Sequence, residues 1–264
     1  MKKGILLISV GTSQLEAFEK TTRCLQKEIE ERFEDWNCYI AISGAQILKK
    51  MNEKSEMPYF SVAEAFAQML SDGIEEAVVQ PTYLLNGMEN DNMLEQIELH
   101  KARFQYLGIG KPLFSAKEDY IKTLHTILGE VNLKEEEALM LVGHGTNHLS
   151  NSAYQNLEYT AYTQGARNVF VGTMEEKSQR MALRKLTASG YKRVRLMPLL
   201  FVAGYHAKKD IAADSNSWKS VLEKAGYEVE PFMIGLGEIK GIRELFIEHL
   251  QKARSDRNSE CENS

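Results

Sequence analysis

Apolar and polar positions along the chain follow two alternating patterns, one typical of buried strands and one typical of amphipathic helices. The run Gly4–Val10 is apolar almost throughout, as strands buried on both faces of a parallel sheet are. From Phe18 to Phe33 apolar residues recur at helical spacing, and Ser13 with Glu16 forms the pattern of a capping box before them. The amino-terminal segment therefore predicts a buried strand followed by a helix.

The same alternation continues along the rest of the chain. A second capping-box pattern, Ser61 with Glu64, opens a helix that extends to about Leu70. The other expected strands are Cys38–Ile42, Ala77–Gln80, Tyr106–Ile109, Ala138–Val142, Val169–Val171, Val194–Met197 and Glu228–Phe232. The other expected helices are Glu89–Phe104, Glu118–Leu128, Asn151–Thr163, Lys177–Ser189, Asp214–Ala225 and Ile239–Ala253, before a polar, frayed tail from Ser255. This order predicts an α/β fold with parallel sheets flanked by helices.

The second half of the chain resembles the first, and the two halves meet at the charged segment Lys134–Glu137. Residues 73–87 carry glycine, proline and glycine at the same spacing as residues 190–204. Likewise, Ser9–Ser13 resembles Gly143–Asn147, and the two matches occur in the same order in each half. The sequence therefore contains an internal repeat.

The repeat predicts two similar lobes, an N-terminal one over residues 1–133 and a C-terminal one over residues 134–264. Each lobe is expected to hold a parallel β-sheet flanked by helices. The active-site cleft is expected between the lobes, where binding sites are often found.

Composition excludes several classes of function. The 264 residues are 43% hydrophobic and 26% charged with a net charge of −5, which favours neither a nucleic-acid partner nor a membrane protein. No apolar run is long enough to cross a bilayer, and the three cysteines lack the spacing of a disulfide framework or zinc finger. No P-loop, Rossmann glycine motif or nucleophile elbow is present, so no nucleotide cofactor is expected. We expect a cytoplasmic protein.

Three potential metal ligands each follow a different strand of the C-terminal lobe. His144 lies in a Gly-His-Gly motif, Glu175 follows the strand Val169–Val171, and His206 follows the strand that begins at Val194. The carboxyl ends of parallel strands meet at one edge of a sheet, so these side chains are expected to converge there. Two imidazoles and a carboxylate suit a first-row divalent metal and leave coordination positions open. Alternatively, His144 bonds a neighbouring carbonyl in a turn, and Glu175 is a favourable charge at a helix start.

Six segments together resemble the anaerobic sirohydrochlorin cobaltochelatases, which are relatives of ferrochelatase in fold. They are Leu6–Ser13, Leu85–Glu89, Val142–His148, Val171–Glu175, Leu196–Ala207 and Ser217–Lys219. The resemblance implies ATP-independent insertion of a divalent metal into sirohydrochlorin during cobalamin biosynthesis, with His144, Glu175 and His206 as metal ligands. Cobalt as the substrate metal rests on this resemblance alone, and Fe²⁺, Ni²⁺ and Zn²⁺ stay open. Two features depart from the family: Tyr83 stands where some relatives have histidine, and Lys208 with Lys209 replaces less charged residues.

Roles follow for the remaining candidates. His144 is the candidate base that accepts a pyrrole proton. Glu89, which the repeat aligns with His206, is a second catalytic candidate, although an acid at a helix start is also favoured by the dipole alone. Substrate binding is assigned to four residues, of which Lys208 would meet a substrate carboxylate: Gly11, Thr12, Gly145 and Lys208.

Three alternatives stay open at this point. The first is a ferrochelatase or nickel chelatase acting on a related tetrapyrrole. The second is a tetrapyrrole- or metal-binding protein without turnover, which predicts tight retention of its ligand. The third is an unrelated α/β enzyme whose histidines are structural. A homo-oligomer is compatible with each of them.

Overall fold

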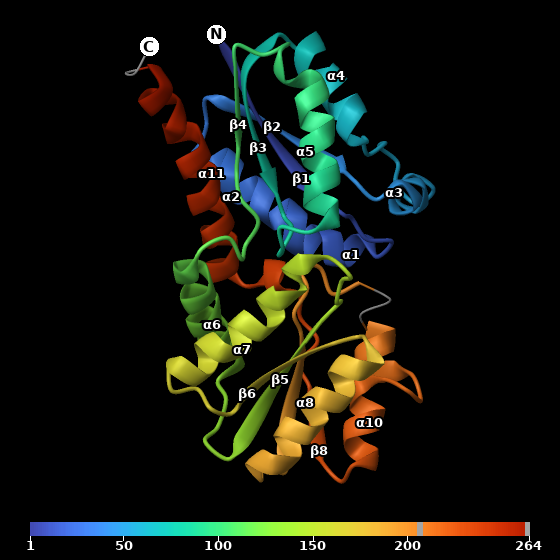
Figure 1. The fold of residues 1–264 in the computed structure, drawn as a ribbon. Coiled ribbons are helices and arrows are strands. Elements are labelled where there is room, and N and C mark those ends of the chain that lie inside the picture. Colours follow the sequence, from blue (N-terminus) through green and yellow to red (C-terminus); the bar gives the residue numbers. More distant parts are fainter. Residues whose placement is uncertain (205–207, 262–264) are drawn as a thin grey trace. The chain divides into compact units, whose positions relative to one another are not determined.

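The computed structural model describes residues 1–204 and 208–261, with side chains as far as residue 256 (Figure 1). The chain divides into two compact units. The N-terminal unit comprises Met1–Ser115 and Arg243–Ser264, and the C-terminal unit comprises Ala116–Ile242. The division thus lies before the boundary expected at residue 133, and the carboxyl-terminal segment belongs to the N-terminal unit.

The N-terminal unit is built around a parallel four-stranded sheet in the order β2-β1-β3-β4. The inner strand β1 is buried from Gly4 to Ser9, which explains the continuous apolar run. The strands are β1 (Lys2–Ser9), β2 (Trp36–Ile42), β3 (Ile74–Pro81) and β4 (Tyr106–Ile109). The helices are α1 (Leu15–Phe18), the π-helical η1 (Glu19–Arg23), α2 (Cys24–Arg32), α3 (Ala45–Asn52), α4 (Val62–Ser71), α5 (Met88–Lys101) and most of α11 (Lys240–Cys261).

The C-terminal unit repeats this topology with the strand order β6-β5-β7-β8, again all parallel. The strands are β5 (Glu137–Gly143), β6 (Val169–Thr173), β7 (Arg193–Pro198) and β8 (Glu228–Pro231). The helices are α6 (Lys117–Val131), η2 (Leu149–Asn151), α7 (Ser152–Thr163), α8 (Glu176–Ser189), η3 (Lys209–Ala213), α10 (Trp218–Lys224) and η4 (Leu236–Glu238). The expected fold class, two similar parallel sheets flanked by helices, is confirmed (Figure 1).

The repeat extends to single hydrogen bonds at the carboxyl edge of each sheet. In the N-terminal unit the amide of Thr82 donates to the carbonyl of Ile8 at 2.8 Å. At the corresponding place in the C-terminal unit, the amide of Leu199 donates to the carbonyl of Val142 at the same distance. The loops that leave β1 and β5 therefore begin from equivalent frameworks.

Two expectations about helix starts have different outcomes. The capping box of Ser61 and Glu64 is confirmed, because Ser61 Oγ accepts from the Glu64 amide and the Glu64 carboxylate accepts from the Ser61 amide. The expected cap at Ser13 is wrong, since α1 begins after Gln14, which makes no side-chain cap. The amide of Gln14 instead donates to Thr12 Oγ1 at 3.2 Å. This hydrogen bond forms a turn before the helix.

The carboxyl-terminal helix continues past Ser255, where a frayed tail was expected. The guanidinium of Arg254 lies 4.6 Å from the ring centroid of Phe33 and 4.9 Å from that of Trp36. The guanidinium of Arg243 binds the Glu28 carboxylate through two hydrogen bonds of 2.9 and 2.7 Å. These contacts with distant segments hold α11 on the N-terminal unit, which a local sequence pattern does not report.

Candidate active site

The loops that leave β5 and β6 run side by side at the carboxyl edge of the C-terminal sheet. Gly143 pairs with Thr173 at the end of the two strands, and the amide of Met174 donates to the carbonyl of Gly143 at 3.0 Å. His144 is the first residue after β5, and Glu175 is the second residue after β6. The strand register therefore places the histidine and the carboxylate on neighbouring loops.

Gly145 brings the two loops into contact. Its φ is +85°, a conformation that residues with a side chain rarely adopt. A Cβ atom at this position would lie 3.2 Å from Glu175 Oε1 and 3.1 Å from Thr173 Oγ1. The absence of a side chain thus lets the Glu175 carboxylate approach the backbone directly beside His144.

The Glu175 carboxylate does not act as a helix cap. Glu175 occupies the N-cap position of α8, yet its side chain accepts no capping hydrogen bond. The neighbouring Glu176 instead forms an ion pair with Arg180 along the helix. Glu176 is therefore the acid that interacts favourably with the helix dipole. The exposed carboxylate of Glu175 is available to a ligand.

His144 is exposed, and its Nδ1 lies 3.1 Å from the carbonyl oxygen of Gly145. A carbonyl oxygen only accepts, so this contact favours the tautomer in which Nδ1 carries the proton. The Nε2 atom then has a lone pair for a proton or a metal ion. The bond to a neighbouring carbonyl, which alone would indicate a structural turn, thus also orients the imidazole for chemistry.

The loop that carries His144 is supported from beneath by Tyr154 of α7. A Cβ atom on Gly143 would lie only 2.1 Å from Tyr154 Cε1, so glycine is required there. The amide of Gly145 donates to Tyr154 Oη at 3.3 Å, and the amide of Thr146 donates to Asn151 Oδ1 at 3.1 Å. Sequence reasoning missed these two supports, because neither Tyr154 of α7 nor Asn151 of η2 belongs to a motif that signals contact with the loop.

Trp218 supports the second loop in the same way. Its ring fills the space above Gly172, where a Cβ atom would lie 2.4 Å from Trp218 Cη2. Its indole Nε1 donates to the carbonyl of Thr173 at 3.1 Å, and the side chain is 1% exposed. The segment Ser217–Lys219 that the family resemblance includes therefore positions the strand end before Glu175.

The third candidate ligand, His206, lies outside the described residues. Within the described parts of the chain, no three His, Cys, Asp or Glu side chains gather as a metal site. Lys208 is exposed, and Lys209 lies 3.4 Å from the Asp214 carboxylate in an ion pair. The structure thus brings His144 and Glu175 into adjoining loops and leaves the completed set of three as a proposal.

The corresponding loop of the N-terminal unit has the same turn without the histidine. Gly11 has a φ of +84°, and a Cβ atom there would lie 2.8 Å from Ile42 Cγ2. Thr12 is buried, and its hydroxyl accepts from the Gln14 amide just as Thr146 Oγ1 accepts from the His148 amide. Packing and turn formation account for both residues, so their expected role in substrate binding stays a prediction.

Glu89 lies in the first turn of α5 and is exposed. Burial raises the pKa of Tyr83 to about 12; the Ser43 hydroxyl opposes this rise and the Glu89 carboxylate adds to it. The charge of Glu89 therefore acts on the phenol of Tyr83, the residue that departs from the family. This places an ionisable pair at the carboxyl edge of the N-terminal sheet.

The fold is of the chelatase type. Two solved structures of the sirohydrochlorin chelatase SirB from Bacillus subtilis, one described with cobalt and one with Fe³⁺, match with TM-scores of 0.65 and 0.67. Each match covers 98% of both chains at 12% and 14% identity, respectively.

The family follows from the sequence comparisons. The cobalt chelatase (CbiK) family matches residues 3–255, and the chain belongs to this family. It is 30% identical to the sirohydrochlorin cobaltochelatase of Salmonella typhimurium over 96% of this chain and 97% of that one. It is also 30% identical to the sirohydrochlorin cobaltochelatase CbiKC of Nitratidesulfovibrio vulgaris, over 96% of this chain and 91% of that one. Among the helices that the structure describes, none is long and apolar enough to span a membrane.

Proposed function

We propose that this chain inserts Co²⁺ into sirohydrochlorin without ATP, as a sirohydrochlorin cobaltochelatase of cobalamin biosynthesis. The single observation that carries the proposal is the contact between the loops of His144 and Glu175 at one sheet edge. Membership of the CbiK family and the two relatives named above support the choice of reaction.

The chemistry requires that two pyrrole protons leave while the metal exchanges its ligands for ring nitrogens. In the proposed mechanism, Nε2 of His144 accepts one of these protons, because a neutral imidazole is a base near neutral pH. Glu175 and His206 hold the incoming metal. An imidazole and a carboxylate leave coordination positions open, so the ring nitrogens can replace the protein ligands one at a time.

Glu89 is proposed as the acceptor of the second proton. Its exposed carboxylate lies at the carboxyl edge of its own sheet, as His144 does in the other unit. The neighbouring phenol of Tyr83 stays protonated well above neutral pH, since its pKa is about 12, so it does not compete with Glu89 as a base. Lys208 is proposed to meet a carboxylate of the substrate through its exposed ammonium group.

The function is tested by mixing the purified protein with sirohydrochlorin and one metal at a time, and following the absorbance of the macrocycle. The proposal expects Co²⁺ insertion over many turnovers, well above the rate without protein. Faster insertion of Fe²⁺, Ni²⁺ or Zn²⁺ at equal concentrations would replace the assignment of cobalt. An absorbance change that stops after one equivalent of protein would instead identify a binding protein without turnover.

A further inference from the structure

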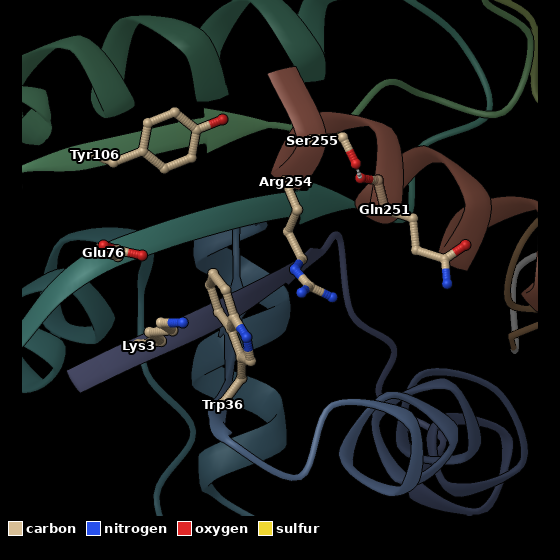
Figure 2. Close-up of a pocket in the computed structure, with 7 residues that line it drawn as sticks. All are labelled: Lys3, Trp36, Glu76, Tyr106, Gln251, Arg254 and Ser255. Atoms are coloured by element: carbon tan, nitrogen blue, oxygen red, sulfur yellow. Dashed lines mark hydrogen bonds between the residues drawn. The ribbon is translucent and has the colours of Figure 1, made fainter. Parts of the chain in front are cut away.

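A cavity lies at the opposite edge of the N-terminal sheet from Gly11 and Glu89. It has a volume of about 530 Å³ and is formed by residues near the start of the four strands β1 to β4 and by residues 251–255 in the second half of α11 (Figure 2). Its walls come from the N-terminal unit alone. It is therefore separate from the residues assigned to metal insertion.

Two cations face this cavity on either side of one aromatic ring. Lys3 Nζ lies 5.6 Å and the Arg254 guanidinium 4.9 Å from the centroid of the Trp36 ring, and Figure 2 shows Trp36 between them. Neither cation has a carboxylate partner among the described side chains. Glu76 also lines the cavity, so two cations oppose one carboxylate there.

The internal repeat provides a comparison for this arrangement. In the repeat alignment, Lys3 corresponds to Glu137 and Glu76 to Arg193, so the charges of this strand pair are reversed in the C-terminal unit. There the arginines are neutralised by acids of the same sheet edge. Arg193 lies 3.0 Å from Glu228, and Arg195 lies 3.7 Å from Glu137 and 3.3 Å from Glu230. A smaller cavity of about 210 Å³ lies at this end of the second sheet, and its arginines are paired with acids. The cavity of the first sheet is larger, and its Lys3 and Arg254 form no such ion pair with the residues that the structure describes.

We propose that this cavity binds a small anion with two or more negative charges, of the phosphate or polycarboxylate type. Lys3 provides a compact ammonium charge, and Arg254 provides a planar fork of donors that its packing on Phe33 and Trp36 already orients. The amide of Gln251, which also lines the cavity, adds a neutral donor. A multiply charged anion is favoured over a single carboxylate because it can bind both cations at once.

Trp36 makes this binding measurable without any assay of metal insertion. The chain has two tryptophans, and the other, Trp218, is 1% exposed in the core of the C-terminal unit. Metal-free protein is titrated with inorganic phosphate, pyrophosphate and citrate at constant ionic strength, with sodium chloride as the reference salt. We expect a saturable change in tryptophan fluorescence with at least one multivalent anion and none with chloride; the arms separate phosphate from carboxylate ligands. Trp36→Phe should remove the signal while calorimetry still detects binding.

Charge variants decide whether the cavity is the site. Lys3→Gln and Arg254→Gln should each weaken binding by about tenfold or more, since each removes one of the two charges. Arg254→Lys should retain most of it, and Lys252→Gln, an exposed lysine of the same helix that does not line the cavity, should leave it unchanged. Circular dichroism checks that each variant is folded. No saturable signal in the wild-type chain, or an affinity in Lys3→Gln and Arg254→Gln equal to that of the wild type, would overturn the proposal and leave the assignment of metal insertion untouched.

Discussion

A Cβ atom on Gly145 would lie 3.2 Å from Oε1 of Glu175, so the carboxylate on the neighbouring loop lies close to the space that a side chain beside His144 would need. This relationship joins the two loops that leave β5 and β6. It makes the position of the carboxylate depend on a residue that has no functional group of its own. The glycine of the Gly-His-Gly motif is thus a positioning residue in the proposed site.

Gly145→Ala should slow metal insertion by about tenfold and weaken metal binding, because the new methyl group displaces the Glu175 carboxylate. Gly165→Ala is the matched control. Gly165 has a φ of +86° in the same unit, but nothing lies within 4 Å of its Cβ position. Both substitutions should destabilise the fold by about 1–2 kcal/mol through backbone strain. Equal insertion rates in the two variants would show that Gly145 does not position Glu175.

His144→Ala should reduce the insertion rate by at least about 100-fold, since it removes the proposed base and a metal ligand together. The fold should be retained, because the side chain is exposed and its hydrogen bond is to Gly145 of its own loop. His125→Ala, which removes another exposed histidine from α6 of the same unit, provides the comparison. Normal insertion by a folded His144→Ala protein would contradict the assignment.

Glu89→Gln should slow insertion by about tenfold, which corresponds to about 1.4 kcal/mol of barrier, with metal affinity nearly unchanged. The control is Asp91→Asn in the same first turn of α5. Both substitutions remove one acid from the helix start, so a dipole effect would change both proteins alike. Steady-state rates and metal titration are compared for the two variants. A similar rate in both would leave Glu89 as a charge at a helix end.

Stability should fall between about pH 10 and pH 12, because the native state keeps phenols protonated that would ionise after unfolding. The pKa of both Tyr83 and Tyr39 is raised to about 12, chiefly by burial. Because the pKa is raised in the folded state, the contribution of each phenol to the free energy of unfolding is complete below the unfolded-state pKa of 10. This contribution is lost as the pH rises toward 12.

Tyr83→Phe should therefore reduce the loss of stability at alkaline pH. The free energy of unfolding is measured with urea at about pH 8, 10 and 11.5, which bracket the range over which tyrosine ionises. Tyr159→Phe is the control, because Tyr159 is 69% exposed. An unchanged pH dependence in Tyr83→Phe would mean that the Tyr83 phenol contributes nothing to it.

Much of this protein could be predicted from its sequence. The continuous apolar runs identify the buried strands, since a strand covered on both faces has no polar side. The recurrence of glycine and proline at equal spacing predicts the repeated sheet, and both Gly73 and Gly190 adopt the positive φ that glycine favours. His144 and Glu175 could be selected because each follows a buried strand of one sheet. These features are periodic or local, so they are visible in a linear sequence.

Only the tertiary structure decided which residues hold the candidate site in place. The packing of Tyr154 against Gly143, and of Trp218 against Gly172, joins residues of different elements with no sequence pattern linking them. The same holds for α11, whose Arg243 and Arg254 bind the N-terminal unit although the helix follows the second repeat. Such contacts depend on shape and on distances set by the whole fold. Local periodicity carries neither, which is why the motifs were predictable and their supports were not.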